Sequence, residues 1–539
     1  MKRVIKRAVS FVLVFMTVFS VFTILPSEVF HTAYVKAAEM FSSETGASTQ
    51  ETYTTDDFTY TLIDEYSKVQ ILSYIGSDTD VVIPDRIDNK KVTSIADSAF
   101  REKSITSVVF GQYVESIGNY AFYGCQSLSK LDFSKSSVKT IGSYAFVMDK
   151  SITTLEFPDS LESIGNYTFS CYRYGTYGSY VANSLKSVKF GSGLKTIGQY
   201  AFYENQKLET IEFTGNSLTS IENNAFYDCL ALKEVNLTGN NAVIGDYAFY
   251  NNDALQKITL SGVKTIGSYA FGYGDSLKNV SLGEGLVSVK NNAFQNCFNL
   301  ETANFSDSLT TISNYAFDNC RKLTEIDIPS KVETLSGYAF SNCSALKNVS
   351  IGSGCTSISS TAFLNSYAIE KIDVAEDNKN YASVDGALLN KEKTSIVLYP
   401  KNKQGEFVIP DTVTTIADYA FNNAPNLTKV TIGANVKTIG TCAFQNCNSL
   451  ETVIFKDSDT VTKTIGDYAF NNCPTLTTVD FGNAVKSIGS YAFMIDKSLE
   501  NIEFPDSLES IGNYAFSCYR YGTYGSYVAN SLKSVKFGS

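Results

Sequence analysis

The stretch Ile117–Phe133, IGNYAFYGCQSLSKLDF, is one unit of a pattern that fills most of this 539-residue chain. Its Ala-Phe pair recurs along the chain, with successive phenylalanines usually 22 to 24 residues apart. A fixed period of this length indicates stacked repeats of one small structural unit. The phenylalanines of the pair are Phe100, Phe122, Phe146, Phe202, Phe226, Phe249, Phe271, Phe294, Phe317, Phe340, Phe363, Phe421, Phe444, Phe470, Phe493 and Phe516, and a Thr-Phe variant adds Phe169.

Two further motifs run in phase with the Ala-Phe pair. The first, Leu-x-x-Ile-x-Phe or a close variant, occurs in 17 segments between Ile105 and Phe537, and its last three positions alternate as in a short strand. The second, Val or Leu-x-x-Ile-Gly, links that strand to the next Ala-Phe pair, as in residues 263–267. Strands this short bury an apolar face only by stacking. The motifs therefore predict a repeat solenoid with parallel strands on one face and short turns or single helical turns on the other.

These motifs resemble the BspA-like, or Treponema-type, leucine-rich-repeat family of bacterial surface proteins. The unit Ile117–Phe133 is similar to a repeat of that family, and residues 58–100 resemble its usual N-terminal start. Residues 381–421 resemble its non-repeat interlude, which explains the 58-residue gap between Phe363 and Phe421. The resemblance covers the chain from about residue 58 onward. It implies a right-handed coil displayed on or released from a bacterium, with adhesion to host proteins, cells or matrix.

The chain divides into six predicted parts. The first resembles an export signal, because a basic start is followed by a mostly apolar run over residues 8–25 and a small-residue cleavage site at Val35-Lys36-Ala37. An uncleaved membrane anchor is the alternative. Because the last repeat stops in mid-unit without a polar cap, we expect the natural protein to continue beyond Ser539. The parts are a signal peptide (1–37), a polar linker (38–57), an N-terminal start segment (58–80), leucine-rich repeats (81–364), a non-repeat β interlude (365–410) and further leucine-rich repeats (411–539).

The charge of the chain limits its partners. Removing residues 1–37 takes away five basic residues and one acidic residue, so the formal net charge falls from −11 to −15. Nucleic acid phosphates repel such a protein. No later stretch is apolar over the ~20 residues that span a bilayer. We therefore expect a protein or glycan partner at the cell exterior, no nucleic acid, and no transmembrane segment after the signal peptide.

The sequence offers few residues for catalysis. The one histidine, His31, lies in the predicted signal peptide, which leaves no His for nucleophile activation or zinc binding. We predict no catalytic residue, no cofactor and no metal. Carboxylate pairs on the strands could act on a sugar, but a solvated face is the favoured interpretation. These acids are Glu209, Glu212, Glu325, Asp327, Glu500 and Glu503.

The eleven cysteines follow the repeat instead of forming CxxC pairs. They are therefore predicted to be free, small, buried side chains, with disulfides between neighbours such as Cys297, Cys320 and Cys343 as the alternative. Tyrosines recur as regularly before Ala-Phe and are interpreted as framework residues. Seven cysteines lie three residues after a repeat phenylalanine: Cys125, Cys229, Cys297, Cys320, Cys343, Cys447 and Cys473.

One interruption of the period is a candidate binding site. The spacing from Phe169 to Phe202 rises to 33 residues, and the extra segment is rich in tyrosine and glycine, a composition typical of binding surfaces. Residues 156–192 recur as residues 503–539 with one difference, Thr168 against Ala515. A recent duplication of a neutral loop is the alternative. The predicted ligand-binding residues are Tyr172, Arg173, Tyr174, Tyr177 and Tyr180, and Tyr519, Arg520, Tyr521, Tyr524 and Tyr527.

Together these features predict a secreted or cell-surface, adhesin-like binding protein. Its partner would contact the strand face and the two Tyr-rich loops. Two alternatives stay open at this point. The repeats could be a structural spacer that presents a C-terminal domain, or, less favoured, a glycan-acting enzyme.

Overall fold

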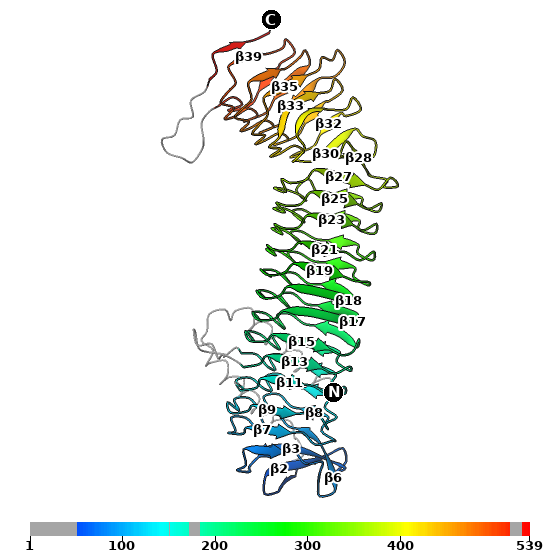
Figure 1. The fold of residues 1–539 in the computed structure, drawn as a ribbon, viewed down its shortest axis with the longest axis vertical. Coiled ribbons are helices and arrows are strands. Elements are labelled where there is room, and N and C mark those ends of the chain that lie inside the picture. The colour runs from blue at the N-terminus through cyan, green and yellow to red at the C-terminus, as the bar shows by residue number, and fades with distance from the viewer. Residues whose placement is uncertain (1–50, 150, 172–183, 518–530, 539) are drawn as a thin grey trace, which may run out of the picture.

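The structure is a computed structural model that describes residues 51–149, 151–171, 184–517 and 531–538. It is a long, narrow stack of turns, and each turn lies against the one before it (Figure 1). The described residues form strands and turns and contain no α-helix. This confirms the predicted solenoid of short parallel strands.

The Val or Leu-x-x-Ile-Gly motif, for which no strand was predicted, forms a ladder of its own, here called the back ladder. In each step the isoleucine aligns with that of the next turn, as Ile117 does with Ile141. The motif forms a strand because its first and last apolar residues both face the core. The back ladder contains β6 (Lys90–Ile95), β8 (Ser116–Ile117), β10 (Thr140–Ile141), β12 (Ser163–Ile164), β14 (Thr196–Ile197), β16 (Leu218–Ile221), β20 (Ser288–Val289), β22 (Thr311–Ile312), β24 (Thr334–Leu335) and β26 (Ser357–Ile358), then β30 (Ser395–Leu398), β32 (Thr415–Ile416), β34 (Thr438–Ile439), β36 (Lys463–Ile465), β38 (Val485–Ile488) and β40 (Ser510–Ile511).

The Leu-x-x-Ile-x-Phe motif forms the predicted strands, here called the front ladder. Strands β17 (Glu234–Ile244) and β18 (Lys257–Ile266) are long enough to run through both ladders. The other front strands are β4 (Asp80–Val82), β7 (Ser107–Val109), β9 (Lys130–Asp132), β11 (Thr154–Glu156), β13 (Ser187–Phe190), β15 (Thr210–Phe213), β19 (Asn279–Leu282), β21 (Thr302–Asn304), β23 (Glu325–Ile328), β25 (Asn348–Ile351), β27 (Lys371–Val374), β31 (Gly405–Val408), β33 (Leu427–Ile432), β35 (Thr452–Phe455), β37 (Thr478–Asp480), β39 (Asn501–Glu503) and β41 (Ser534–Lys536).

The repeat phenylalanines form two stacks of rings along the core, one from Phe100 to Phe363 and one from Phe421 to Phe516. Consecutive rings lie about one strand spacing apart, for example 5.0 Å between the centroids of Phe294 and Phe317. At the N-terminal end Tyr74 takes the same position and stacks on Phe100 at 5.3 Å. Tyr74 ends β3 (Lys68–Tyr74), which forms an antiparallel sheet with β1 (Thr52–Thr54) and β2 (Phe58–Ile63) and pairs in parallel with β6; the short β5 (Arg86–Ile87) lies antiparallel to β6. This sheet starts the stack.

The segment around residue 380 divides the core into two clusters and coincides with a bend of the stack (Figure 1). It contains the antiparallel pair β28 (Tyr381–Val384) and β29 (Ala387–Asn390). Because successive strand residues face opposite sides, β29 serves both clusters: Leu388 packs in the first, and Ala387 and Leu389 pack in the second. The back ladder then resumes, because Ile396 of β30 aligns with Ile416 of β32.

Tyr399 takes the position of a repeat phenylalanine in the first turn after this division. Its ring stacks on Phe421 at 4.6 Å, and its N–H donates to the carbonyl of Ala420, as the N–H of Phe421 does to Ala443. The Tyr399 hydroxyl is buried and has no hydrogen-bond partner. A buried, unpaired hydroxyl costs about 1–3 kcal/mol.

Replacing Tyr399 with phenylalanine should therefore increase the free energy of unfolding by about 1 kcal/mol or more. Urea unfolding followed by far-UV circular dichroism would measure the change. Tyr74→Phe is the matched control, because the Tyr74 hydroxyl donates to the carbonyl of Asp78 at 2.8 Å. Loss of this hydrogen bond should leave the free energy of unfolding unchanged or lower it. A chain that is stabilised by Tyr74→Phe and destabilised by Tyr399→Phe would contradict the argument.

Prolines divide the front ladder into segments. Five front strands have a proline within two residues of their end, and each is the first strand of its hydrogen-bonded segment: β4, β11, β23, β31 and β39. At five continuous steps the residue after the strand donates its N–H to the preceding turn, as Gly352 does to Ile328 at 2.9 Å; at others, such as β11 to β13, no such bond is found among the described residues. Proline has no N–H to donate, so this bond cannot form at the steps that carry one. We call each such break a joint. A fifth break, between β15 and β17, has no proline and keeps the bond from Lys233 to Glu209.

Candidate functional site

A surface pocket of about 740 Å³ opens at the joint between β9 and β11. Pro158 follows β11 and cannot donate to the carbonyl of Phe133, and the described residues show no backbone hydrogen bond between these two strands. The rings of Phe133 and Phe157 meet at 43°, whereas Phe110 and Phe133, within one segment, lie at 4°. The two turns therefore splay apart, and their phenylalanines form an apolar part of the pocket lining.

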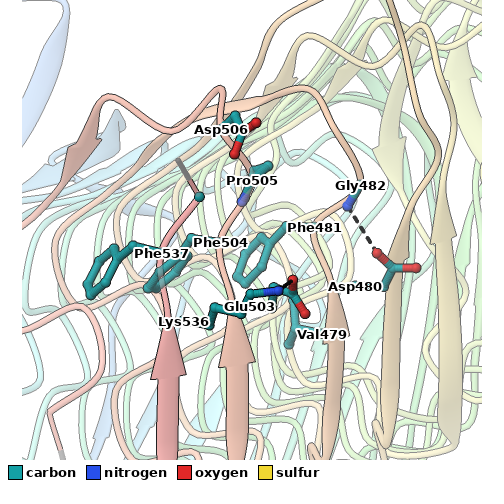
Figure 2. A pocket seen from close by; sticks show the side chains of 11 residues that line it. Val479, Asp480, Phe481, Gly482, Glu503, Phe504, Pro505, Asp506, Lys536 and Phe537 are labelled. Atoms are coloured by element: carbon teal, nitrogen blue, oxygen red, sulfur yellow. Dashed lines mark hydrogen bonds and ion pairs between the residues drawn. The ribbon is translucent and has the colours of Figure 1, made fainter.

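A second pocket, of about 640 Å³, opens at the joint between β37 and β39. Figure 2 shows Phe481, Phe504 and Phe537 side by side, with Lys536 extended to Glu503. Phe481 and Phe504 meet at 39°. The second pocket repeats the first, because six of its lining residues lie 347 positions after their counterparts: Glu503, Phe504, Pro505, Asp506, Lys536 and Gly538 for Glu156, Phe157, Pro158, Asp159, Lys189 and Gly191. The duplicated segment thus carries one copy of the pocket in each of its two positions.

Charged groups surround the apolar lining of both pockets. In the first, Lys189 pairs with Glu156 at 2.9 Å, and this carboxylate raises the pKa of the lysine. The Ser192 N–H donates to Asp159 at 2.8 Å and holds the pKa of that carboxyl below its ordinary value. Ser134 similarly donates to Asp132 and lowers its pKa. Asp159 and Asp132 therefore stay ionised into mildly acidic conditions and give the pocket fixed negative charges.

The ten predicted ligand-binding residues, Tyr172 to Tyr180 and Tyr519 to Tyr527, lie outside the described residues. The described residues on either side of the first loop belong to the core. Phe169 stacks between Phe146 and Phe202, and Leu185 is buried at the start of the next front strand. The first loop therefore connects a core turn to β13, whose Lys189 and Gly191 line the first pocket.

The strand acids lie on the solvated face, as expected. Glu212, Glu325, Asp327, Glu500 and Glu503 are exposed, and Glu209 is half-buried. Three of them pair with a lysine of the next turn, for example Glu209 with Lys233 at 2.6 Å and Glu500 with Lys533 at 2.9 Å. The face therefore carries both acidic and basic side chains. Exposed pairs of this kind contribute little stability.

The regular tyrosines stack on one another along the turns. Tyr120 and Tyr144 lie 4.9 Å apart and Tyr315 and Tyr338 lie 4.7 Å apart, with nearly parallel rings. Each has a left-handed backbone, for example φ 56° at Tyr120. Because neighbouring tyrosines cover the ring faces, the stacks present edges rather than faces. They are therefore poorly suited to stacking against a sugar ring.

The buried-side-chain interpretation of the cysteines agrees with the structure. The ten described cysteines are free and buried. Seven thiols donate to the carbonyl of the repeat phenylalanine one turn earlier, as Cys125 does to Phe100 at 3.0 Å. Within the described ranges, no group of three or more His, Cys, Asp or Glu residues could hold a metal ion. The same ranges contain no helix able to cross a membrane.

The two pockets were not predicted from the sequence. The signal was present, since Pro158 and Pro505 each lie two residues after the end of a front strand. The effect of these prolines on the preceding turn can be predicted only when the register of the ladder is known.

The chain is a leucine-rich-repeat solenoid, as shown by its two strand ladders, its stacked phenylalanine rings and its regularly placed, buried free cysteines. The model of the BspA type leucine rich repeat region matches residues 93–177, 175–282, 264–383 and 397–521. The chain belongs to this BspA-type leucine-rich-repeat family.

Solved structures similar to the chain include bacterial leucine-rich-repeat proteins. One from Bacteroides ovatus is 21% identical, with 90% of this chain and 99% of that chain covered and a TM-score of 0.47. A leucine-rich cell surface protein from Faecalibacterium prausnitzii is 22% identical, with 91% and 95% covered and a TM-score of 0.34. The T. pallidum leucine-rich-repeat protein is 26% identical, with 38% and 91% covered and a TM-score of 0.34. No curated protein matches the chain.

Proposed function

We propose that this chain is an exported, adhesin-like binding protein, and that the duplicated segment supplies two copies of its contact surface for a protein partner. The observation that carries the proposal is the pocket that appears twice with the same Glu, Phe, Pro, Asp and Lys residues. Apolar rings beside fixed charges suit contacts with protein side chains. The Tyr-rich loops leave the same segment and would add aromatic anchors.

Export rests on residues 1–37, which lie outside the described residues and have the pattern of a signal peptide. The formal charge of −15 expected after its removal disfavours nucleic acid. The favoured role is binding rather than catalysis, because the described pockets have no histidine and are open to solvent. An open site does not dehydrate a carboxyl enough to raise its pKa for acid catalysis.

Binding of the full chain to immobilised collagen, fibronectin and laminin, and to a glycan array, would test this proposal. Changing the four tyrosines of each loop to serine should weaken binding by at least about tenfold. Pro158→Thr with Pro505→Thr should also weaken it, because threonine restores the N–H that closes the joint; Thr214 already donates in this way to Phe190. Tyr66→Ser is the control, since Tyr66 is exposed and far along the chain from either pocket.

The outcomes separate the candidate functions. Selective binding to a matrix protein that both sets of variants weaken supports the proposal. Undiminished binding by all of the variants would refute these sites. Binding to no member of the panel would favour the structural spacer, and turnover of a glycan would favour the enzyme.

A further inference from the structure

In nine of the described turns the side chain three residues after the repeat phenylalanine connects its turn to the turn before it. Ser366 shows the full pattern: its hydroxyl donates to the carbonyl of Phe340 at 2.8 Å and accepts the N–H of Cys343 at 3.0 Å. Asn205 at this position donates to Phe169, and seven cysteines donate their thiols in the same direction. The position therefore suits a side chain that can donate a proton to a carbonyl oxygen.

Two turns, 347 residues apart, have an aspartate at this position. Asp149 and Asp496 are 3% and 4% exposed. The Cys473 N–H donates to Asp496 at 2.7 Å, but the other oxygen of Asp496 and both oxygens of Asp149 have no hydrogen-bond partner. By the register of the other turns, the carbonyls of Phe122 and Phe470 would be the acceptors of a proton from these side chains, and the Phe122 carbonyl also accepts the Cys125 N–H at 3.2 Å. An ionised carboxylate has no proton to donate, whereas a protonated carboxyl can accept the N–H and donate to the carbonyl.

No positive charge compensates these carboxyls among the described residues. Asp149 faces the buried thiol of Cys125, and Asp496 faces those of Cys473 and Cys447. The charged groups Glu102 and Lys103 lie beyond Cys125, and Lys497 is exposed. Burial raises the pKa of both aspartates well above the ordinary value.

The backbone beside each aspartate is also strained. Met148 and Ile495 have φ values of 70° and 69°. In many other turns this left-handed position is occupied by asparagine, which tolerates it, whereas a β-branched residue there is an outlier. The two turns therefore combine a strained residue with an unpaired buried acid.

We propose that Asp149 and Asp496 form two acid-dependent bridges, each of which holds its turn against the preceding turn when the carboxyl is protonated and releases it when the carboxyl ionises. The released turns contain β11 and β39, which form one side of each pocket. Binding at the pockets would thus respond to acidity, but the bridges themselves do not depend on any partner.

The direction of the pH effect follows from linkage. An aspartate whose pKa is raised by folding binds more protons in the folded state than in the unfolded state. Its contribution to stability is therefore fully present below the unfolded pKa of about 3.9 and is lost as the pH rises through the higher folded pKa. The two turns should be held most firmly in acid, opposite to a salt-bridged aspartate.

Hydrogen–deuterium exchange of the full chain at pH 5.0 and pH 7.5, corrected for the intrinsic exchange rate, tests the bridges without a ligand. Amides of residues 140–157 and 487–504 should exchange at least tenfold faster at pH 7.5. Residues 317–328, where Cys320 takes the position, should show no such change. Asp149→Asn and Asp496→Asn should protect their own turn at pH 7.5 and remove its pH dependence, because Asn205 at this position donates its side-chain amide to the carbonyl of Phe169.

Asp496→Ser, which introduces the side chain that Ser366 has at this position, is a second variant with the same expectation. Equal protection of both turns in the wild-type chain at the two pH values would overturn the proposal. A folded asparagine variant that keeps the pH dependence of its own turn would do the same. The wild-type comparison decides the question even where a variant fails to fold.

Discussion

Replacing Phe294 with alanine is expected to lower the free energy of unfolding by about 3–5 kcal/mol. The Phe294 ring is fully buried and stacks between Phe271 and Phe317, at 5.3 and 5.0 Å. Alanine removes the buried ring area, leaves a cavity and ends both ring contacts. Because each turn of a solenoid contacts only its neighbours, the damage also weakens the coupling between the two sides of the stack.

Urea unfolding by far-UV circular dichroism would measure the loss, and hydrogen exchange of the turns on either side would locate it. Phe298→Ala is the matched control. Phe298 is only half-buried and lies against the guanidinium of Arg321, 4.8 Å from its ring centroid. Its loss should cost about 1 kcal/mol or less. Equal losses for the two variants would show that the ring stack is not the main support of the fold.

Replacing Gly262 with alanine is expected to destabilise the central turns by about 2–5 kcal/mol, as the sum of two effects. Gly262 has a left-handed backbone, with φ of 64°, which disfavours any residue with a Cβ atom. A Cβ atom would also lie 2.1 Å from the carbonyl oxygen of Gly239, so the backbones of β17 and β18 would have to move apart. This is where both ladders merge into two long paired strands.

Gly272→Ala is the control ten residues further along. A Cβ atom at Gly272 would meet nothing closer than the Tyr250 ring at 3.4 Å, and its backbone is not left-handed. Alanine there should be neutral or stabilise by about 0.4–1 kcal/mol, because it restricts the unfolded chain. Both variants would be compared by urea unfolding under the same conditions. A harmless Gly262→Ala would mean that β17 and β18 adjust more easily than the close contact suggests.

Much of the fold follows from local pattern alone. The spacing of residues such as Phe122 and Phe146 gives one phenylalanine per turn. Because the turns stack, their buried rings are predicted to stack as well. The position of Cys125, three residues after its phenylalanine, predicted a small buried side chain in the same way. The back ladder was missed because its strands are mostly two residues long, too short for alternation to distinguish a strand from a turn. Tyr399 was missed because the spacing around it is irregular.

The candidate sites show the limit of this approach. The structure shows that the N–H that Pro158 lacks would have donated to the preceding turn, and a pocket lies there. Nothing was predicted for Asp149, which the structure buries at a position where other turns have a proton donor. The Tyr-rich loops remain a prediction.

The sequence by itself determined the solenoid, its period and the identity of its core side chains, because burial that repeats every 22 to 24 residues is a local property of each unit. The tertiary structure alone decided where the stack bends, where the front ladder breaks, and which polar groups lack a partner. Those features depend on hydrogen bonds between residues one turn apart, and only the register of the stacked turns specifies which donor meets which acceptor.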